Sequence, residues 1–236
     1  MTNILIIYYS AYGHVFEMAQ ASARGAASAE GVEVKIARIP EMESENNRTP
    51  YLDKRKKQDD NALAVKFKTV GRFAKYEASL EAQKDIPVAT IDDLRWADGI
   101  VWGFPTYFGS MPSQVKLFLE FASELCGGGD LEGKPAGLMT SAGSIHAGHE
   151  ATLLTSMVPL FHFGMIIVGL PYSENPEYLT ADAIGCSPYG ASTVAGPDSS
   201  RTPDGRELIM AGRLGKRVAA VAAALKKDGF LKGSSA

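Results

Sequence analysis

Residues 4–14, ILIIYYSAYGH, decide the fold: a short apolar run is followed by a small polar turn, and the pattern then becomes that of a helix. Consecutive aliphatic residues are typical of a strand covered on both faces. The turn contains the hydroxyl groups of Ser10 and Tyr12, and a helix that follows has first-turn N–H groups without an intrahelical acceptor. These donors and the positive end of the helix dipole are typical of a phosphate-binding loop. An ordinary strand-to-helix turn is the alternative.

Length, composition and charge restrict the class of protein. The 236 residues are 45% hydrophobic and 22% charged, which suits a globular chain with a large core. The net charge is −3, whereas nucleic-acid binding needs a concentrated basic face. The dense basic run at residues 54–57 is followed by Asp59 and Asp60, so we interpret it as a solvated surface loop. We therefore expect small-molecule partners and no nucleic acid.

The cysteines and the apolar runs indicate the compartment. Cys126 and Cys186 are far apart in the chain and form no CxxC pair, which argues against iron–sulfur clusters, zinc ribbons and thioredoxin-like chemistry. No metal site is predicted. The N-terminal apolar run is too short for a signal peptide, and no later run approaches membrane-spanning length. We expect a cytoplasmic protein without membrane insertion.

Apolar runs that alternate with helical patterns predict an α/β fold. Continuous apolar runs are typical of parallel strands, and between them apolar residues recur at helical spacing. Pro112 suits the start of a helix, and Asp204 with Glu207 has the spacing of a capping box. The pattern predicts a doubly wound five-stranded parallel sheet with helices on both faces. The expected strands are residues 3–9, 32–38, 98–103, 135–140 and 165–170.

Residues 41–85 fit this scheme poorly, because a crossover between the second and third strands needs far fewer residues. We interpret them as an insertion, with a helix around residues 59–84, in a single domain that spans residues 1–236. Its purpose stays open among a lid, an oligomer contact and a passive excursion. Residues 171–203 form a second irregular stretch, rich in Pro, Gly, Ser and Asp.

Three loops are expected to meet at one edge of the sheet, because ligands bind beyond the carboxyl ends of parallel strands. They are residues 10–15, 103–110 and 141–149, which follow the first, third and fourth strands. A phosphate site beside an aromatic loop and a loop of backbone donors suits flavin mononucleotide (FMN), a flat apolar ring with a dianionic phosphate. No GxGxxG or GxxxxGK[ST] motif supports a dinucleotide fold or a P-loop. The alternatives are core aromatics at Phe104 and Phe108 and solvated histidines at His146 and His149.

Three segments resemble the WrbA-type NAD(P)H:quinone oxidoreductases: YYSAYGH at residues 8–14, PTYFG at residues 105–109 and SPYGASTVAG at residues 187–196. The similarity covers nearly everything outside residues 41–85. It implies a flavodoxin-like fold, FMN as cofactor, NADH or NADPH as electron donor, a homotetramer (or dimer), and two-electron reduction of quinones. The last segment is the most specific of the three, because flavodoxins proper lack it.

The resemblance also implies roles for individual residues. Tyr12 matches a position that also touches the nicotinamide cofactor, and His162 is expected to approach the flavin from the side of the fifth strand. The implied FMN contacts are Ser10, Ala11, Tyr12, Gly13, His14 and Val15 at the phosphate, Thr106, Tyr107 and Phe108 beside the ring, Ser141, Ala142, Gly143, Ser144, Ile145 and His146 along its other edge, and His162.

The sequence departs from the family pattern at two positions near the implied site. Tyr107 stands where the family often has Arg, and Cys126 stands where it often has Trp, which leaves the preferred quinone and the choice between NADH and NADPH open. The loop with Ile145 and His146 looks more like that of the p-benzoquinone reductases. Pro159 would break the helix before His162 if it lay in its interior.

The expected mechanism is ping-pong: NAD(P)H reduces the flavin and leaves, and a quinone then takes the same slot. The flavin supplies the redox chemistry, and the protein supplies position and charge. The candidate proton donors to the quinol are His146 and His162, because imidazole changes charge near neutral pH. The alternatives are a flavodoxin-like electron carrier and an interaction protein that has lost flavin.

Overall fold

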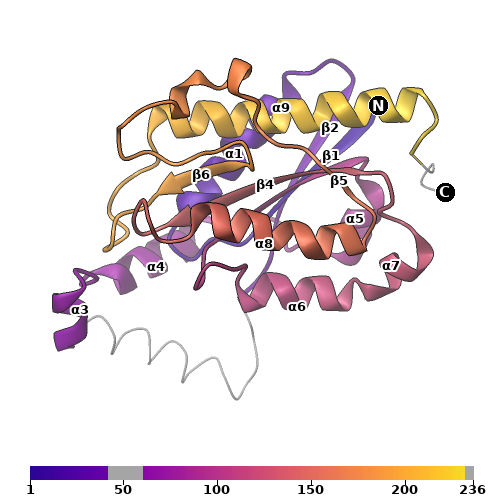
Figure 1. The fold of residues 1–236 in the computed structure, drawn as a ribbon. Helices are drawn as coiled ribbons and strands as arrows, with labels where there is room; N and C mark the ends of the chain where they lie inside the picture. Colours follow the sequence, from indigo (N-terminus) through magenta and orange to yellow (C-terminus); the bar gives the residue numbers. More distant parts are fainter. Residues whose placement is uncertain (42–60, 232–236) are drawn as a thin grey trace.

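A computed structural model describes residues 1–41 and 61–231. Its centre is a parallel β-sheet with the strand order β2-β1-β3-β4-β5, and β6 pairs with β4 beside β5 (Figure 1). The first four strands are β1 (Thr2–Tyr8), β2 (Val32–Arg38), β3 (Gly99–Pro105) and β4 (Pro135–Ala142). Each lies within two residues of its predicted bounds at either end, because buried parallel strands are continuous apolar runs. The predicted doubly wound parallel sheet is confirmed.

The fifth position of the sheet is divided between two short strands. β5 (Ile166–Ile167) pairs with the start of β4, and β6 (Ala191–Val194) pairs with its end. The predicted strand 165–170 is therefore too long, and β6 lies within the stretch expected to be irregular. Beyond β5, a Cβ atom on Gly169 would lie 2.2 Å from the Pro188 carbonyl oxygen, so the chain between the two strands packs too closely for a regular ladder. That intervening chain includes two short 3-10 helices, η1 (Tyr172–Glu174) and η2 (Pro176–Tyr178).

Helices cover both faces of the sheet (Figure 1). On one face lie α1 (His14–Ala27) and α9 (Gly205–Lys227), and α9 begins with the predicted capping box of Asp204 and Glu207. The other face carries α5 (Ile91–Trp96), α6 (Ser113–Phe121), α7 (Ser123–Gly128) and α8 (His149–His162). Among the described residues, no helix has the length and apolarity needed to cross a membrane.

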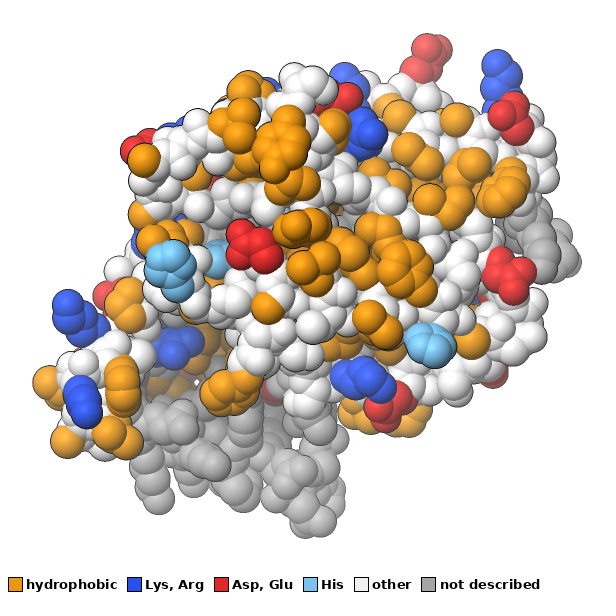
Figure 2. Space-filling model, in the orientation of Figure 1, with side chains coloured by type: hydrophobic (Ala, Val, Ile, Leu, Met, Phe, Trp, Pro, Cys, Tyr) orange, Lys and Arg blue, Asp and Glu red, His pale blue; other side chains and the backbone are white. Residues whose placement is uncertain are grey.

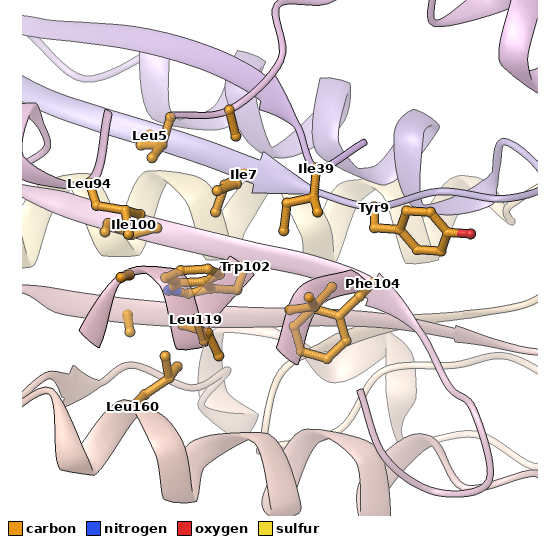
Figure 3. Close-up of a cluster of buried hydrophobic side chains, with 14 of the residues drawn as sticks. Leu5, Ile7, Tyr9, Ile39, Leu94, Ile100, Trp102, Phe104, Leu119 and Leu160 are labelled. Carbon is orange, nitrogen blue, oxygen red and sulfur yellow. The ribbon is translucent and has the colours of Figure 1, made fainter. Parts of the chain in front are cut away.

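Two hydrophobic cores lie on opposite faces of the sheet, because successive strand residues point to opposite sides. On β1, Ile4 and Ile6 pack toward α1 and α9, whereas Leu5 and Ile7 pack into the other core. Figure 3 shows this second core, whose labelled members are Leu5, Ile7, Tyr9, Ile39, Leu94, Ile100, Trp102, Phe104, Leu119 and Leu160.

The predicted insertion contains two described helices rather than one. They are α3 (Ala62–Lys66) and α4 (Arg72–Ala82), and Gly71, at a φ of 87°, precedes the second. A left-handed glycine favours a break between helices, which explains why one continuous helix over residues 59–84 is wrong. Residues 42–60, which include the start of that predicted helix and the basic run, lie outside the described residues.

Candidate cofactor site

A cavity of about 490 Å³ opens at the carboxyl edge of β1, β3 and β4. It lies within the range of about 300–1,000 Å³ typical of small-molecule sites. The three predicted loops meet there, as the crossover geometry of a parallel sheet requires. Its lining residues are Ser10, Ala11, Tyr12, His14, Val15, Arg72, Pro105, Thr106, Tyr107, Phe108, Ser141, Ala142, Gly143, Ala195 and Ser199.

The first loop presents the N-terminus of α1, whose N-cap residue is a glycine. Gly13 occupies the N-cap position of α1 at a φ of 91° and makes no capping hydrogen bond. Phe16 N donates to Ser10 Oγ at 3.2 Å, which leaves the Ser10 hydroxyl proton able to donate in turn. The backbone N–H groups of His14 and Val15 belong to the first turn and have no intrahelical acceptor, and both residues line the cavity. This donor set fits a dianionic phosphate.

His14 is neutral in this setting. Its side chain is buried, and this burial lowers the pKa of the imidazole, although the bond to the Arg201 carbonyl acts in the opposite direction. Nε2 lies 2.9 Å from Arg201 O, and a carbonyl only accepts, so Nε2 carries the proton. His14 therefore ties α1 to the loop before α9 and adds no positive charge to the cavity.

The second loop places an aromatic side chain at the edge of the cavity. Thr106 Oγ1 accepts from Gly109 N at 3.2 Å and lies 2.5 Å from Thr152 Oγ1, which holds the loop against α8. Phe108 is fully exposed, and its φ of 55° is uncommon for an aromatic residue. Phe104, by contrast, is buried in the core at 1% exposure. The core interpretation is thus correct for Phe104 and wrong for Phe108.

The third loop divides between the cavity and the surface. Ser141, Ala142 and Gly143 line the cavity, whereas residues 144–146 do not and are exposed. His149 is buried, with Nε2 3.1 Å from Ser144 O, and its burial lowers the pKa of the ring. We interpret His149 as the residue that holds the loop in place. His146 is a solvated side chain on that loop, and His149 is not.

The structure does not bring His162 to this cavity within one chain. α8 follows β4 and returns along it, so His162 lies near the start of β4, where Gly133 N donates to Gly164 O at 2.9 Å. There it lines a different hollow, of about 510 Å³, between α6 and α8. Cys126 lies beside it, with Sγ 3.1 Å from His162 O. The hollow extends from His162 to Ser110 and Met111, which follow the second loop, but His162 itself lies at the end of the hollow away from the carboxyl edge.

Pro159 lies inside α8 without ending it. Proline removes the N–H group that would donate to the carbonyl of Thr155, and the helix closes its last turn through Phe163 N, 3.1 Å from Leu160 O. The expectation that Pro159 would break the helix before His162 is wrong, because one missing hydrogen bond near the C-terminus is not enough to end it.

The cavity also contains residues that the sequence did not identify as site residues. Arg72 comes from α4 in the insertion, and no motif marks it. Ala195 belongs to the SPYGASTVAG segment. That segment supports the family resemblance, but none of its residues was predicted to contact FMN. Ser199 has a φ of 61°, an uncommon conformation that only the structure reveals. The described residues contain no cluster of His, Cys, Asp or Glu that could hold a metal ion.

Comparison with known proteins places the chain in a family. The model of the NADPH-dependent FMN reductase family matches residues 2–177. An NAD(P)H dehydrogenase (quinone) of Syntrophobacter fumaroxidans is 38% identical over 229 residues, 96% of this chain and 100% of that protein. A protein of the same name from Geobacter sulfurreducens is 39% identical over 94% of this chain and 98% of its own length.

Solved structures share the fold at low sequence identity. A WrbA-like flavodoxin from Agrobacterium tumefaciens superposes with a TM-score of 0.59 at 20% identity, over 95% of this chain and 99% of that one. Flavodoxin 1 from Bacillus cereus gives 0.52 at 15% identity, over 93% and 98% of the two chains. These likenesses confirm the flavodoxin-like architecture, and the relatives' names agree with the resemblance that the three sequence segments carry.

Proposed function

This chain belongs to the NADPH-dependent FMN reductase family, and we propose that it is an FMN-dependent oxidoreductase that transfers two electrons from NAD(P)H to quinones. The observation that carries the proposal is the cavity in which the glycine-started N-terminus of α1 meets an aromatic loop and the third loop, at residues 141–143. The names of the curated relatives, NAD(P)H dehydrogenase (quinone), support the donor and the acceptor.

The residues present fit FMN. Its phosphate would lie at the N-terminus of α1, held by the N–H groups of His14 and Val15 and by the Ser10 hydroxyl. The flat ring would extend toward Thr106, Tyr107 and the residues that line the cavity from the third loop. When bound, FMN supplies hydride acceptance from NAD(P)H and electron transfer to a quinone.

The chain itself would bind and orient the flavin and the substrate, and it would tune the reactivity of the flavin ring. Backbone donors of Ala142 and Gly143 at the end of β4 would stabilise negative charge at the polar edge of the reduced ring. Because Phe108 is fully exposed, it would offer its face to a planar substrate that enters the cavity. Both donor and quinone would use this one opening, which implies that the first product leaves before the second substrate binds.

The proposed reaction also needs a proton donor for the quinol. His146 lies on the third loop, close in sequence to the cavity residues, and we propose it as the proton donor to the quinol. His162 would need to come from a second copy of the chain, since within one chain it lies at the end of α8, near the start of β4. This requirement is consistent with the proposed homotetramer or homodimer.

The experiment has two stages. An absorbance scan of the purified protein should show bound flavin, and anaerobic NADH and NADPH in separate samples should each be tested for bleaching. Steady-state rates with both substrates varied should then give parallel double-reciprocal lines. Intersecting lines would contradict the shared opening. Protein that binds flavin but oxidises neither donor would indicate an electron carrier, and protein that binds no flavin would indicate an interaction protein.

A further inference from the structure

Helix α4 of the insertion packs along the proposed phosphate loop. Gln83 Nε2 donates to Ser10 O at 3.1 Å, and a Cβ atom on Gly13 would lie 3.7 Å from Ser79 Oγ. The rings of Tyr76 and Tyr12 meet edge to face, with centroids 6.3 Å apart. The insertion therefore packs against the first loop at Ser10, Tyr12 and Gly13.

These contacts come from one face of the helix. Positions 72, 76, 79 and 83 are spaced by four, three and four residues, which aligns them in a single stripe. At the N-terminal end of this stripe, the guanidinium carbon of Arg72 lies 4.4 Å from the centroid of the Tyr12 ring. Stacking on an aromatic face orients the planar group of arginine, whose N–H donors lie along its edge.

Arg72 brings positive charge to the cavity. Among the described residues that line it, Arg72 is the only one with a permanent charge, because His14 is neutral. Its charge is close enough to the first loop to lower the pKa of His14, and Lys75 on the next turn acts in the same direction.

We propose that Arg72 binds a phosphate group of the ligand held in this cavity, which makes α4 a functional wall of the site. The proposal rests on the function proposed above. A guanidinium and a phosphate can form paired charge-assisted hydrogen bonds, so the match is chemical as well as electrostatic. Two phosphates qualify: that of FMN, and the phosphates of the nicotinamide dinucleotide.

The test removes the charge and measures binding to the apoprotein. FMN and riboflavin are titrated separately into flavin-free Arg72→Gln and wild-type protein, and flavin fluorescence reports each dissociation constant. If Arg72 holds the FMN phosphate, Arg72→Gln weakens FMN binding about tenfold or more and leaves riboflavin binding unchanged. If it holds a dinucleotide phosphate, both flavins bind as before, and the KM of the reconstituted enzyme for NADH or NADPH rises instead.

Two further variants make the result specific. Arg72→Lys keeps the charge and should recover part of the lost affinity. Arg217→Gln removes an arginine that pairs with Glu174 at 3.1 Å, away from the cavity lining, and should behave like wild type. If Arg72→Gln does not fold, as judged by circular dichroism, Arg72→Met keeps the aliphatic stem over Tyr12 and carries the same test.

The outcomes separate this inference from the proposed function. Wild-type binding of FMN, together with less than a twofold change in FMN affinity and in both donor KM values for Arg72→Gln, would overturn the role of Arg72 alone. Failure of the wild-type protein to bind FMN would instead overturn the function on which the inference rests.

Discussion

Glu207 shows how one residue organises the loops around the cavity. Its carboxylate is completely buried and accepts hydrogen bonds from the backbone N–H groups of Gly185 and Asp204, at 2.8 and 2.7 Å, and from the Thr193 hydroxyl at 2.7 Å. Arg201 lies 3.2 Å away as its ion-pair partner. Every neighbour donates, so only an anion satisfies all of them. The same residue closes the capping box of α9.

Replacing Glu207 with Gln should be strongly destabilising. The amide would turn an N–H group toward donors and remove the closer of the two carboxylates that face Arg201, the other being Asp204 at 4.0 Å. Each buried donor left without an acceptor costs about 1–3 kcal/mol. Urea unfolding monitored by circular dichroism measures the free energy of unfolding. Glu174→Gln, at an exposed pair with Arg217, is the matched control and should change it by less than about 1 kcal/mol. Equal effects would show that burial of the carboxylate is unimportant.

The buried histidines predict how stability depends on pH. Burial lowers the pKa of His14 and of His149 in the folded state, so the unfolded chain binds more protons below an ordinary histidine pKa. Their contribution is present above that pKa and is lost as the pH falls through the folded-state values. His149→Gln keeps a donor for the Ser144 carbonyl and should make the fall in unfolding free energy between pH 7 and pH 5 shallower.

The control for this pH effect is His146, which is exposed on the same loop. His146→Gln should leave the pH dependence of unfolding as in the wild type. A steeper fall in His149→Gln than in the wild type would contradict the assignment of His149 as a buried neutral group.

At the scale of elements, α1 and α9 pack unusually closely on one face of the sheet. A Cβ atom on Gly25 would lie 1.8 Å from Gly212 O, and one on Gly215 would lie 2.1 Å from Ser22 O. The two helices therefore touch through backbone at both points. This closeness seats α1 firmly against the sheet, and α1 provides the N-terminus that forms the phosphate loop.

Gly215→Ala should push these helices apart. A methyl group cannot fit 2.1 Å from a carbonyl oxygen, and overpacking of this kind costs about 1–3 kcal/mol or more. Gly205→Ala is the control, because a Cβ atom there would meet no atom within 4 Å and alanine is the better helix former. Urea unfolding of both variants should show a loss for Gly215→Ala and no loss for Gly205→Ala. The reverse order would refute the close approach.

At the scale of the whole molecule, the site consists of segments far apart in the sequence. The loops after β1, β3 and β4, helix α4 and the chain after β6 all meet at one edge of the sheet. A ligand bound there connects all of them, so it should stabilise the entire fold.

The surface of the molecule has an apolar patch. Figure 2 shows that apolar side chains gather on the face over α8, where Leu154, Val158 and Phe161 are exposed.

FMN at about 100 times its dissociation constant should add about 2.7 kcal/mol to the free energy of unfolding. For a chain of this size, that corresponds to a rise in Tm of roughly 5–10 °C. Differential scanning fluorimetry of the flavin-free protein measures this rise. Riboflavin at the same concentration should give a clearly smaller shift, since it lacks the phosphate. Equal shifts for both flavins would contradict a phosphate site at α1.

Sequence reasoning predicted the elements whose signals are local. Continuous apolar runs identified β1 to β4, and Asp204 with Glu207 marked the start of α9. The three loops could be brought to one edge in advance, because parallel strands all end there. Sequence reasoning did not predict that the fifth position of the sheet is divided between β5 and β6. β6 is only four residues long and pairs with the end of a distant strand.

The sequence by itself determined the alternation of strands and helices and the kind of site they form, since periodicity and turn composition act over a few residues. Only the tertiary structure decided which side chains reach that site. Arg72 arrives from a charged segment with no motif, whereas His162 lies at the opposite edge because α8 runs back along β4. The positions of these side chains depend on how elements far apart in the chain pack together, so a local sequence pattern cannot predict them.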